Sequence, residues 1–250
     1  MKTLVCVQVA MKEEGLGFAE KLGLKEVEKL DEELGFRQFH GFYGQNLEVR
    51  LFLQGTDIRH NAEQIGLEAA AVCTTLLINR FRPKLLLNFG TAGAFTQSGF
   101  ALGEVTLVEG PIRFHDRRVP LPGYFESQEG NHPVADFSNL KTVLGVKTSK
   151  LSSGSSLEMC ARDEEILKSH FADLKEMEGA AIAWIADKKK VPFIALKAVT
   201  DFIDHHESIE AQFLANLALA SRNVQDAAIR TLGFLDGNSG DPIWTFSNCP

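Results

Sequence analysis

Carboxylate side chains stand next to an apolar or small-residue run at three places in the sequence. Glu14 follows the run at 4–10, Asp201 follows the run at 192–199, and Glu178 comes directly before a stretch of small residues. Two carboxylates in different environments can divide the work of a general acid and a general base. Because ligands bind at the carboxyl ends of strands in open α/β sheets, this pattern indicates one active site built from three segments.

Each carboxylate also has a simpler explanation when it is taken alone. Asp201 suits a turn or a helix cap as well as it suits acid catalysis. Glu178 could merely complement the positive N-terminus of a helix, and Glu14 lies in a charge run at 11–14 that suits a solvated helix start. The functional alternative for Glu178 is ribose binding, with Met177 packed on the sugar, because a carboxylate accepts two hydrogen bonds from a diol.

A fourth segment, Gly90-Thr91-Ala92-Gly93, follows the apolar run at 85–89. Glycine permits tight turns and a close approach of the backbone to a ligand, so the segment predicts a ligand-contacting turn at a strand end. An ordinary turn between a strand and a helix explains the spacing equally well. The segment matches neither the G-x-G-x-x-G nor the Walker A pattern, and we expect no cofactor.

Apolar runs alternate with helical patterns along most of the chain. This predicts a single-domain α/β fold with a mixed, mostly parallel central sheet flanked by helices. The domain is predicted to cover residues 1–236, with a flexible tail at 237–250, and the aperiodic stretch at 115–140 is predicted to be a functional or subunit-contact loop. Predicted strands span 4–10, 45–54, 85–89, 105–108, 143–150 and 192–199, and predicted helices span 13–33, 62–79, 163–170, 179–188 and 209–234.

Charge and cysteine content narrow the class of protein. The 250 residues carry a formal net charge of -7, which gives no general attraction to nucleic acid or to anionic membranes. No stretch approaches the length of a transmembrane helix, and the opening run ends in charges without a signal-peptide cleavage site. The cysteines are far apart and form no C-x-x-C pair, so we expect a reducing compartment, the cytoplasm; they are Cys6, Cys73, Cys160 and Cys249.

Taken together, these segments resemble the purine nucleoside phosphorylase/nucleosidase superfamily, and within it the plant-type 5′-methylthioadenosine nucleosidases. The resemblance follows chain order over nearly the whole sequence and is weaker in residues 15–60 and in the tail. The segments that carry it are AMKEE at 10–14, NFGTAGAF at 88–95, FHDRRVPLP at 114–122, LSSGSSLEM at 151–159, LKEMEGAAIAWIAD at 174–187, VPFIALKAVTDFID at 191–204 and AQFLANL at 211–217.

The resemblance implies a role for each matching residue. Asp201 would donate a proton toward N7 of a purine, and Glu14 would be the base that activates the attacking water. The remaining matches would contact the substrate: Glu178 at the ribose hydroxyls, Met177 against the sugar, Thr91 near the water and ribose, Leu157 at the purine, and Lys175 and Glu176 in the same binding segment.

The resemblance also bears on the nucleophile. Phosphorylases that resemble this chain carry a phosphate-binding arginine where Asn88 stands, and Glu13 and Glu14 would repel phosphate. We therefore expect hydrolysis of a purine nucleoside, with 5′-methylthioadenosine as substrate and S-adenosylhomocysteine as a second candidate. A phosphorylase and a non-catalytic nucleoside-storage protein are the alternatives. Ser155 and His170-Phe171 depart from the plant-type pattern, which leaves the 5′ specificity open.

Two further clusters have no catalytic assignment. The run His115-Asp116-Arg117-Arg118 is interpreted as an edge of the active site or a subunit contact, and we expect a homodimer whose contact involves residues 114–122. The run Asp204-His205-His206-Glu207 has possible metal ligands but no partners at fixed spacing, so it predicts a solvated turn and no metal site.

Overall fold

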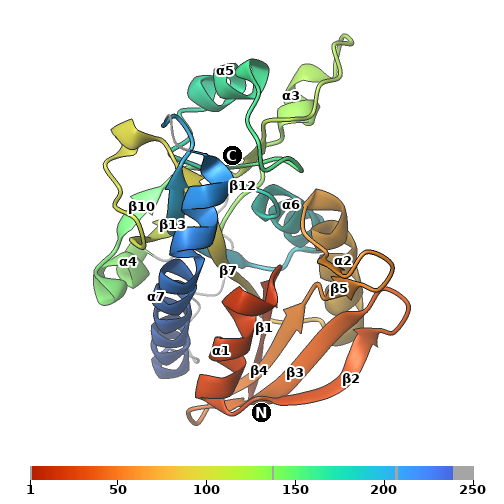
Figure 1. The fold of residues 1–250 in the computed structure, drawn as a ribbon. Coiled ribbons are helices and arrows are strands. Elements are labelled where there is room, and N and C mark those ends of the chain that lie inside the picture. The colour runs from red at the N-terminus through yellow and green to blue at the C-terminus, as the bar shows by residue number, and fades with distance from the viewer. Residues whose placement is uncertain (1, 137, 206–207, 239–250) are drawn as a thin grey trace.

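A mixed β-sheet runs through the centre of the protein in a computed structural model that describes residues 2–136, 138–205 and 208–238 (Figure 1). Its central pairs are parallel, and its antiparallel pairs lie toward both edges. This confirms the mixed, mostly parallel α/β prediction. In order across the sheet the strands are β10 (Lys147–Ser149), β8 (Val105–Val108), β13 (Phe193–Phe202), β7 (Leu85–Ala94), β1 (Thr3–Val9), β4 (Leu47–Leu53), β3 (Phe36–Tyr43) and β2 (Lys25–Asp31).

Three short strands extend this sheet beside the end of β7, and two more form a separate hairpin. β12 pairs antiparallel with the last residues of β7 and parallel with β11, which also pairs with β9. These strands bring the 174–176 segment next to the carboxyl end of β7. Their bounds are β9 (Arg113–Phe114), β11 (Leu151–Ser153) and β12 (Leu174–Glu176), and the hairpin consists of β5 (Thr56–Asp57) and β6 (Ala62–Glu63).

Helices cover both faces of the sheet, because β7 and β13 are apolar on both sides (Figure 1). Leu85 and Leu87 face a core shared with α1 (Lys12–Leu22) and α7 (Ile209–Gly237), whereas Leu86 faces a core shared with α2 (Leu67–Phe81) and α6 (Gly179–Lys189). The helices are α1 (Lys12–Leu22), α2 (Leu67–Phe81), α3 (Phe125–Glu129), α4 (Ser138–Leu144), α5 (Ala161–Ser169), α6 (Gly179–Lys189) and α7 (Ile209–Gly237), with a 3-10 turn at Thr96–Ser98.

The helix predicted over 13–33 is wrong in its second half. α1 ends at Leu22 because Gly23 adopts a left-handed conformation (φ 63°), and β2 follows. The apolar residues of β2, Val27 and Leu30, are three apart, which is a helical spacing. In the strand this spacing places the two side chains on opposite faces, so Leu30 is buried while Val27 is exposed, and the pairing with β3 shifts register between Val27 and Asp31.

Four other predicted boundaries need correction. Strand β7 does not turn at Gly90 but continues to Ala94, because β13 and β12 continue to pair with it. Helix α2 begins at Leu67 rather than 62. The predicted strand at 143–150 is the end of α4 followed by β10, and the predicted loop at 115–140 contains α3 and the start of α4. Strand β3 was not predicted.

Helix α7 continues to Gly237, and the predicted tail falls almost entirely at 239–250, outside the described residues. Within the ranges that the structure describes, no helix is long and apolar enough to cross a membrane.

Candidate active site

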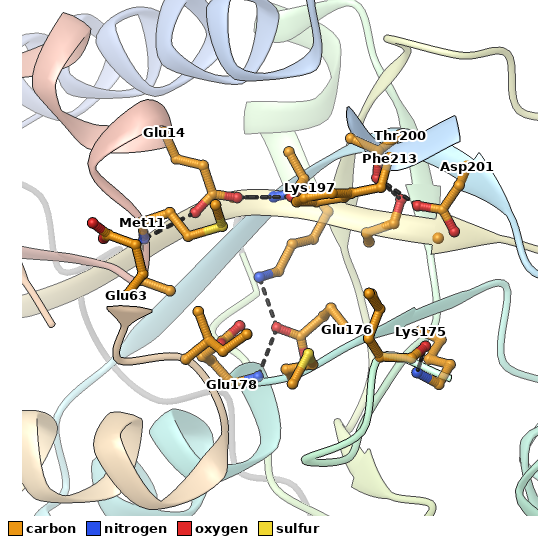
Figure 2. Close-up of a pocket in the computed structure, with 18 of the residues that line it drawn as sticks. Met11, Glu14, Glu63, Lys175, Glu176, Glu178, Lys197, Thr200, Asp201 and Phe213 are labelled. Atoms are coloured by element: carbon orange, nitrogen blue, oxygen red, sulfur yellow. Dashed lines mark hydrogen bonds and ion pairs between the residues drawn. The ribbon is translucent and has the colours of Figure 1, made fainter. Parts of the chain in front are cut away.

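A cavity of about 290 Å³ opens at the carboxyl ends of β1, β7 and β13, which is where an α/β sheet is expected to bind its ligand (Figure 2). Its volume is at the small end of the range for ligand pockets, so it suits a small molecule. The structure brings all eight predicted site residues to this cavity: Glu14, Thr91, Leu157, Lys175, Glu176, Met177, Glu178 and Asp201.

Asp201 lies near the end of β13, where a β-bulge changes the pairing with β7. The register shifts between Val199 and Asp201 and places Asp201 opposite Gly93. A Cβ atom on Gly93 would lie 2.5 Å from Asp201 Oδ2, so only glycine leaves room for this carboxyl group. The Thr200 hydroxyl donates to Asp201 Oδ1 at 2.7 Å. Burial raises the pKa of Asp201, and the Thr200 hydrogen bond and the charge of Lys175 oppose this only in part. The group is therefore suited to hold a proton for a leaving group.

Glu14 reaches the cavity from the first turn of α1. Its Oε1 accepts hydrogen bonds from the backbone N–H of Thr91 at 2.7 Å and from the Thr91 hydroxyl at 2.8 Å, and its Oε2 accepts from the Met11 N–H at 3.3 Å. Burial raises the pKa of Glu14, while the positive charge of Lys197 and the Thr91 hydrogen bonds act in the opposite direction. A carboxylate fixed in this way can accept a proton from a nearby nucleophile.

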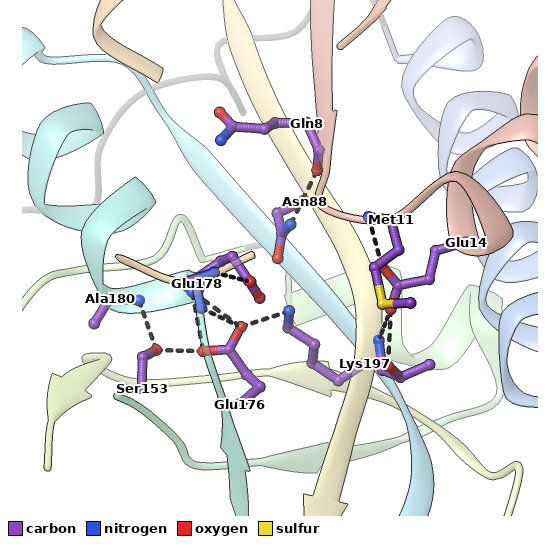
Figure 3. A network of polar contacts seen from close by, with 12 residues as sticks. Gln8, Met11, Glu14, Asn88, Ser153, Glu176, Glu178, Ala180 and Lys197 are labelled. Carbon is purple, nitrogen blue, oxygen red and sulfur yellow. Dashed lines mark hydrogen bonds and ion pairs between the residues drawn. The ribbon is translucent and has the colours of Figure 1, made fainter. Parts of the chain in front are cut away.

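Lys197 is a buried cation between three glutamates (Figure 3). Its Nζ donates to Glu176 Oε2 at 2.8 Å, and Glu176 also accepts the N–H groups of Glu178 and Gly179. Burial disfavours both charges, but their mutual attraction still raises the pKa of Lys197 and lowers that of Glu176. The pair is therefore ionised and has little freedom to move.

Glu178 precedes α6 and accepts a hydrogen bond from the N–H of Gly66 at 2.8 Å. Burial raises its pKa to about 8, with a further contribution from the negative charge of Glu176. An un-ionised Glu178 at neutral pH lowers the negative charge that Lys197 has to balance. Met177 lines the same part of the cavity.

Replacing Lys197 with methionine is expected to lower the free energy of unfolding by about 3–5 kcal/mol near pH 8, because the Glu176 carboxylate loses its buried counter-ion. Folding lowers the pKa of Glu176. The ion pair therefore stabilises the folded protein fully at pH values above the pKa that Glu176 has in the unfolded chain, and this stabilisation is lost as the pH falls through the lower pKa of the folded state. The deficit should therefore shrink in acid. Urea unfolding at several pH values measures it. The double variant Lys197→Met with Glu176→Gln is the control and should recover part of the loss; equal stability of wild type and Lys197→Met near pH 8 would contradict the argument.

Lys175 and Leu157 are linked through the loop that follows β11. Lys175 Nζ donates to the backbone oxygens of Ser156 at 2.5 Å and Leu157 at 2.9 Å. The same loop is fixed by Asp116, whose Oδ2 accepts the N–H of Ser155 at 2.6 Å. The run 115–118 thus supports one edge of the cavity.

The departures from the family pattern lie in different places. The Ser155 hydroxyl donates to Glu68 at 2.9 Å, and neither residue lines the cavity. His170 is hydrogen-bonded to Glu129 at 2.9 Å, and the exposed Phe171 adopts a left-handed conformation (φ 52°); neither residue lines the cavity. Asp204 accepts hydrogen bonds from the backbone and hydroxyl of Thr96, which is a structural role, and His206 and Glu207 fall outside the described residues.

Sequence reasoning did not identify several residues of the cavity wall. Glu63 and Ile65 come from the β6 hairpin region, Phe213 from α7, and Ile203 from the end of β13. Glu63 accepts the N–H of Lys12 at 3.2 Å and so holds the hairpin against the start of α1. Glu63 and Ile65 lie in none of the segments that carry the resemblance, so no signal pointed to them, whereas Ile203 and Phe213 lie within the quoted segments at 191–204 and 211–217.

Fold and site together define an α/β protein with an acid-lined pocket for a small ligand. The description of the family model that matches residues 4–233 is "Phosphorylase superfamily". Relatives include the 5′-methylthioadenosine nucleosidase of Arabidopsis thaliana, 33% identical over 92% of this chain and 86% of that protein. The 5′-methylthioadenosine/S-adenosylhomocysteine nucleosidase of the same plant is 33% identical over 95% and 93%. The solved apo structure of Arabidopsis thaliana 5′-methylthioadenosine nucleosidase is similar with a TM-score of 0.92 and 32% identity, over 97% of this chain and 98% of that one. The chain belongs to the phosphorylase superfamily.

Proposed function

We propose that this protein is an N-ribosyl hydrolase that cleaves the N-glycosidic bond of a purine nucleoside. The preferred substrate is 5′-methylthioadenosine, with S-adenosylhomocysteine as a second candidate, and the products are adenine and a 5-substituted ribose. The observation that carries the proposal is the convergence of Glu14, Glu178 and Asp201 on one cavity. The named activities of the similar Arabidopsis thaliana proteins support it.

The proposed mechanism uses two carboxyl groups in opposite protonation states. Asp201 donates its proton to N7 of the purine, so the bond between N9 and C1′ breaks and its electron pair leaves with a neutral base. Ribose acquires oxocarbenium character at C1′, which nearby carboxylates stabilise. Water attacks C1′, and its proton passes to Glu14.

The other site residues bind and orient the substrate in this proposal. Glu178 binds the ribose diol: its raised pKa keeps it un-ionised at neutral pH, so it donates to one hydroxyl and accepts from the other, and Met177 packs against the sugar. Thr91 holds Glu14 in place near the ribose. Leu157 borders the purine, and Lys175 and Glu176 fix the walls on which these contacts depend.

Water is favoured over phosphate as the nucleophile because of the charges around the cavity. Lys197 is already paired with Glu176, and Glu14 and Glu178 lie on the same cavity. A phosphate dianion there would face Glu14, which the mechanism requires as an ionised carboxylate, in a poorly solvated space, which is costly. The neutral Asn88 stands on the cavity floor.

The test is adenine release from 5′-methylthioadenosine with and without inorganic phosphate. We expect equal rates in both conditions and a free 5-methylthioribose product, because no step uses phosphate. Chromatography of the sugar product measures this. Turnover only with phosphate, giving a sugar 1-phosphate, would establish the phosphorylase alternative. Binding without any turnover would establish the storage alternative.

We also propose a homodimer in the cytoplasm. The segment at 114–122 and the residues after it expose apolar side chains, including Leu121 and Tyr124, which a second copy could cover. Cys6, Cys73 and Cys160 are free thiols, as suits a reducing compartment. Light scattering of the purified protein tests the dimer.

A further inference from the structure

Asn88 carries a buried side-chain oxygen that has no hydrogen-bond partner among the described residues. The residue is 2% exposed, and it lines the cavity. Its Nδ2 donates to the backbone oxygen of Gln8 at 2.9 Å, which fixes the orientation of the amide because only the nitrogen can donate to a carbonyl group. Oδ1 therefore points away from Gln8 (Figure 3), and Asn88 belongs to the lining of the cavity. A buried acceptor without a partner needs a donor from a ligand or from water.

Gln8 cannot turn to satisfy that oxygen itself. Its Nε2 donates to the backbone oxygen of Ala70 at 3.0 Å, and its Oε1 accepts from the Thr74 hydroxyl at 2.7 Å. The Gln8 side chain is thus held in a network between β1 and α2, whereas the contact that orients Asn88 is made by the backbone oxygen of Gln8 in β1.

The space next to Asn88 lies between a hydrogen-bond acceptor, Glu14, and a hydrogen-bond donor, Lys197. Asn88 and Gly90 are two residues apart in β7 and face the same side of the sheet, and Lys197 lies opposite Gly90 on β13. Gly90 has no side chain, and a Cβ there would lie 3.1 Å from Glu14 Oε1. The missing side chain leaves a space between Glu14 and Lys197, with Asn88 one step deeper along β7.

We propose that Asn88 is a water-binding residue that selects water as the nucleophile, an inference that rests on the proposed hydrolase function. Asn88 Oδ1 accepts one hydrogen bond from the water, and Glu14 accepts the other. Lys197 has only Glu176 as hydrogen-bond partner within the described part of the chain, so a second N–H can donate to a lone pair of the water. The remaining lone pair faces C1′.

The proton balance follows from this arrangement. As the bond from water oxygen to C1′ forms, the C1′–N9 bond breaks and its electron pair leaves with the base that Asp201 protonates. The water proton that faces Glu14 passes to Glu14. Asn88 takes up no proton and keeps its hydrogen bond to the hydroxyl that remains.

Asn88 Oδ1 can only accept hydrogen bonds, and this explains why the space beside it selects water. A water molecule donates two hydrogen bonds, so it satisfies both Asn88 Oδ1 and Glu14. A phosphate dianion offers at most one O–H, and its other oxygens would face acceptors. Methanol has a single O–H and would leave one of the two acceptors unpaired, which makes it a probe of the same selection.

The test is the partition of the reaction between water and methanol. The full-length protein is incubated with 5′-methylthioadenosine in a water–methanol mixture, and mass spectrometry gives the ratio of methyl 5-methylthioriboside to 5-methylthioribose. Asn88→Leu removes the acceptor without adding room. We expect the methanol fraction to rise about tenfold and kcat to fall about tenfold, with a KM close to wild type, which is the size expected for one lost hydrogen bond.

Two further variants separate water binding from structural damage. Asn88→Ser, whose hydroxyl is too short to replace the amide oxygen, should shift the partition in the same direction if the leucine variant does not fold. Thr74→Val disturbs the network that anchors Gln8 but not the acceptor, so its partition should match wild type.

The results distinguish a failure of the role proposed for Asn88 from a failure of the proposed hydrolase function. A wild-type partition in the folded leucine and serine variants would overturn the role of Asn88, while leaving the hydrolase intact. If the effect of Asn88→Leu disappears with a 2′-deoxy substrate, Asn88 binds the ribose hydroxyl and the water-binding assignment is wrong. Lack of turnover by wild-type protein on any purine nucleoside would overturn the proposed function and this inference with it.

Discussion

Replacing Asp201 with asparagine is expected to lower kcat for 5′-methylthioadenosine by about 10²- to 10⁴-fold, the range for loss of a general acid. That loss corresponds to about 2.7–5.4 kcal/mol of transition-state stabilisation. KM should change little, because an asparagine amide can still donate a hydrogen bond to N7 but cannot transfer a proton. Adenine release at saturating substrate measures kcat, and circular dichroism checks that the variant is folded.

A substrate methylated at N7 provides the control for Asp201. Its base is already cationic and leaves without a proton, so the wild type and Asp201→Asn should hydrolyse it at rates within about tenfold of each other. An equal loss on both substrates would show that Asp201 binds the base rather than protonating it.

The stability of the same variant depends on pH with a definite sign. Burial raises the pKa of Asp201, so between the unfolded and folded pKa values the folded state binds more protons than the unfolded state. Wild-type stability therefore falls as pH rises through this window. Asparagine does not titrate and should remove this loss, so the variant should be the more stable protein at alkaline pH. Thermal unfolding at acid and alkaline pH tests this.

The sequence predicted which segments meet at the site but not how the side chains are aimed. Strand ends and carboxylates made Glu14, Glu178 and Asp201 candidates, because the carboxyl ends of parallel strands lie at one edge of a sheet, and the family resemblance then assigned their roles. The bulge before Asp201 and its fit over Gly93 depend on pairing between strands far apart in the sequence. No local pattern carries that information.

The same distinction explains the errors in the fold. Central strands such as β7 and β13 are buried on both faces, so their composition reveals them. Strand β2 lies at an edge, is largely exposed, and contains a register shift, so its sequence is under little pressure to alternate. The glycines of β7 suggested a turn, but the strand continues because its neighbours supply hydrogen bonds for it.

Glutamine at position 14 is expected to lower kcat by about 10²- to 10⁴-fold, because the amide cannot take the proton of the attacking water. Glutamine can still accept the hydrogen bonds of Thr91 through its side-chain oxygen and loses only the long one from the Met11 N–H, so the fold and substrate binding should be retained. Since burial raises the pKa of Glu14, wild-type activity should fall in acid at a pH above the usual range for a glutamate, and the acid limb should disappear in the residual activity of the variant. A pH profile of kcat measures both effects.

The neighbouring Glu13 is the matched control for Glu14. Both are in the first turn of α1, but the side chain of Glu13 is 40% exposed and it is not among the residues that line the cavity. Glu13→Gln should therefore keep wild-type kcat. Unlike Asp201→Asn, Glu14→Gln should also lose activity on the N7-methylated substrate, because activation of water is needed whichever base leaves. Retained activity of Glu14→Gln on that substrate would refute the assignment of Glu14 as the base. The N7-methylated base leaves without an acid, but the reaction still needs an activated water.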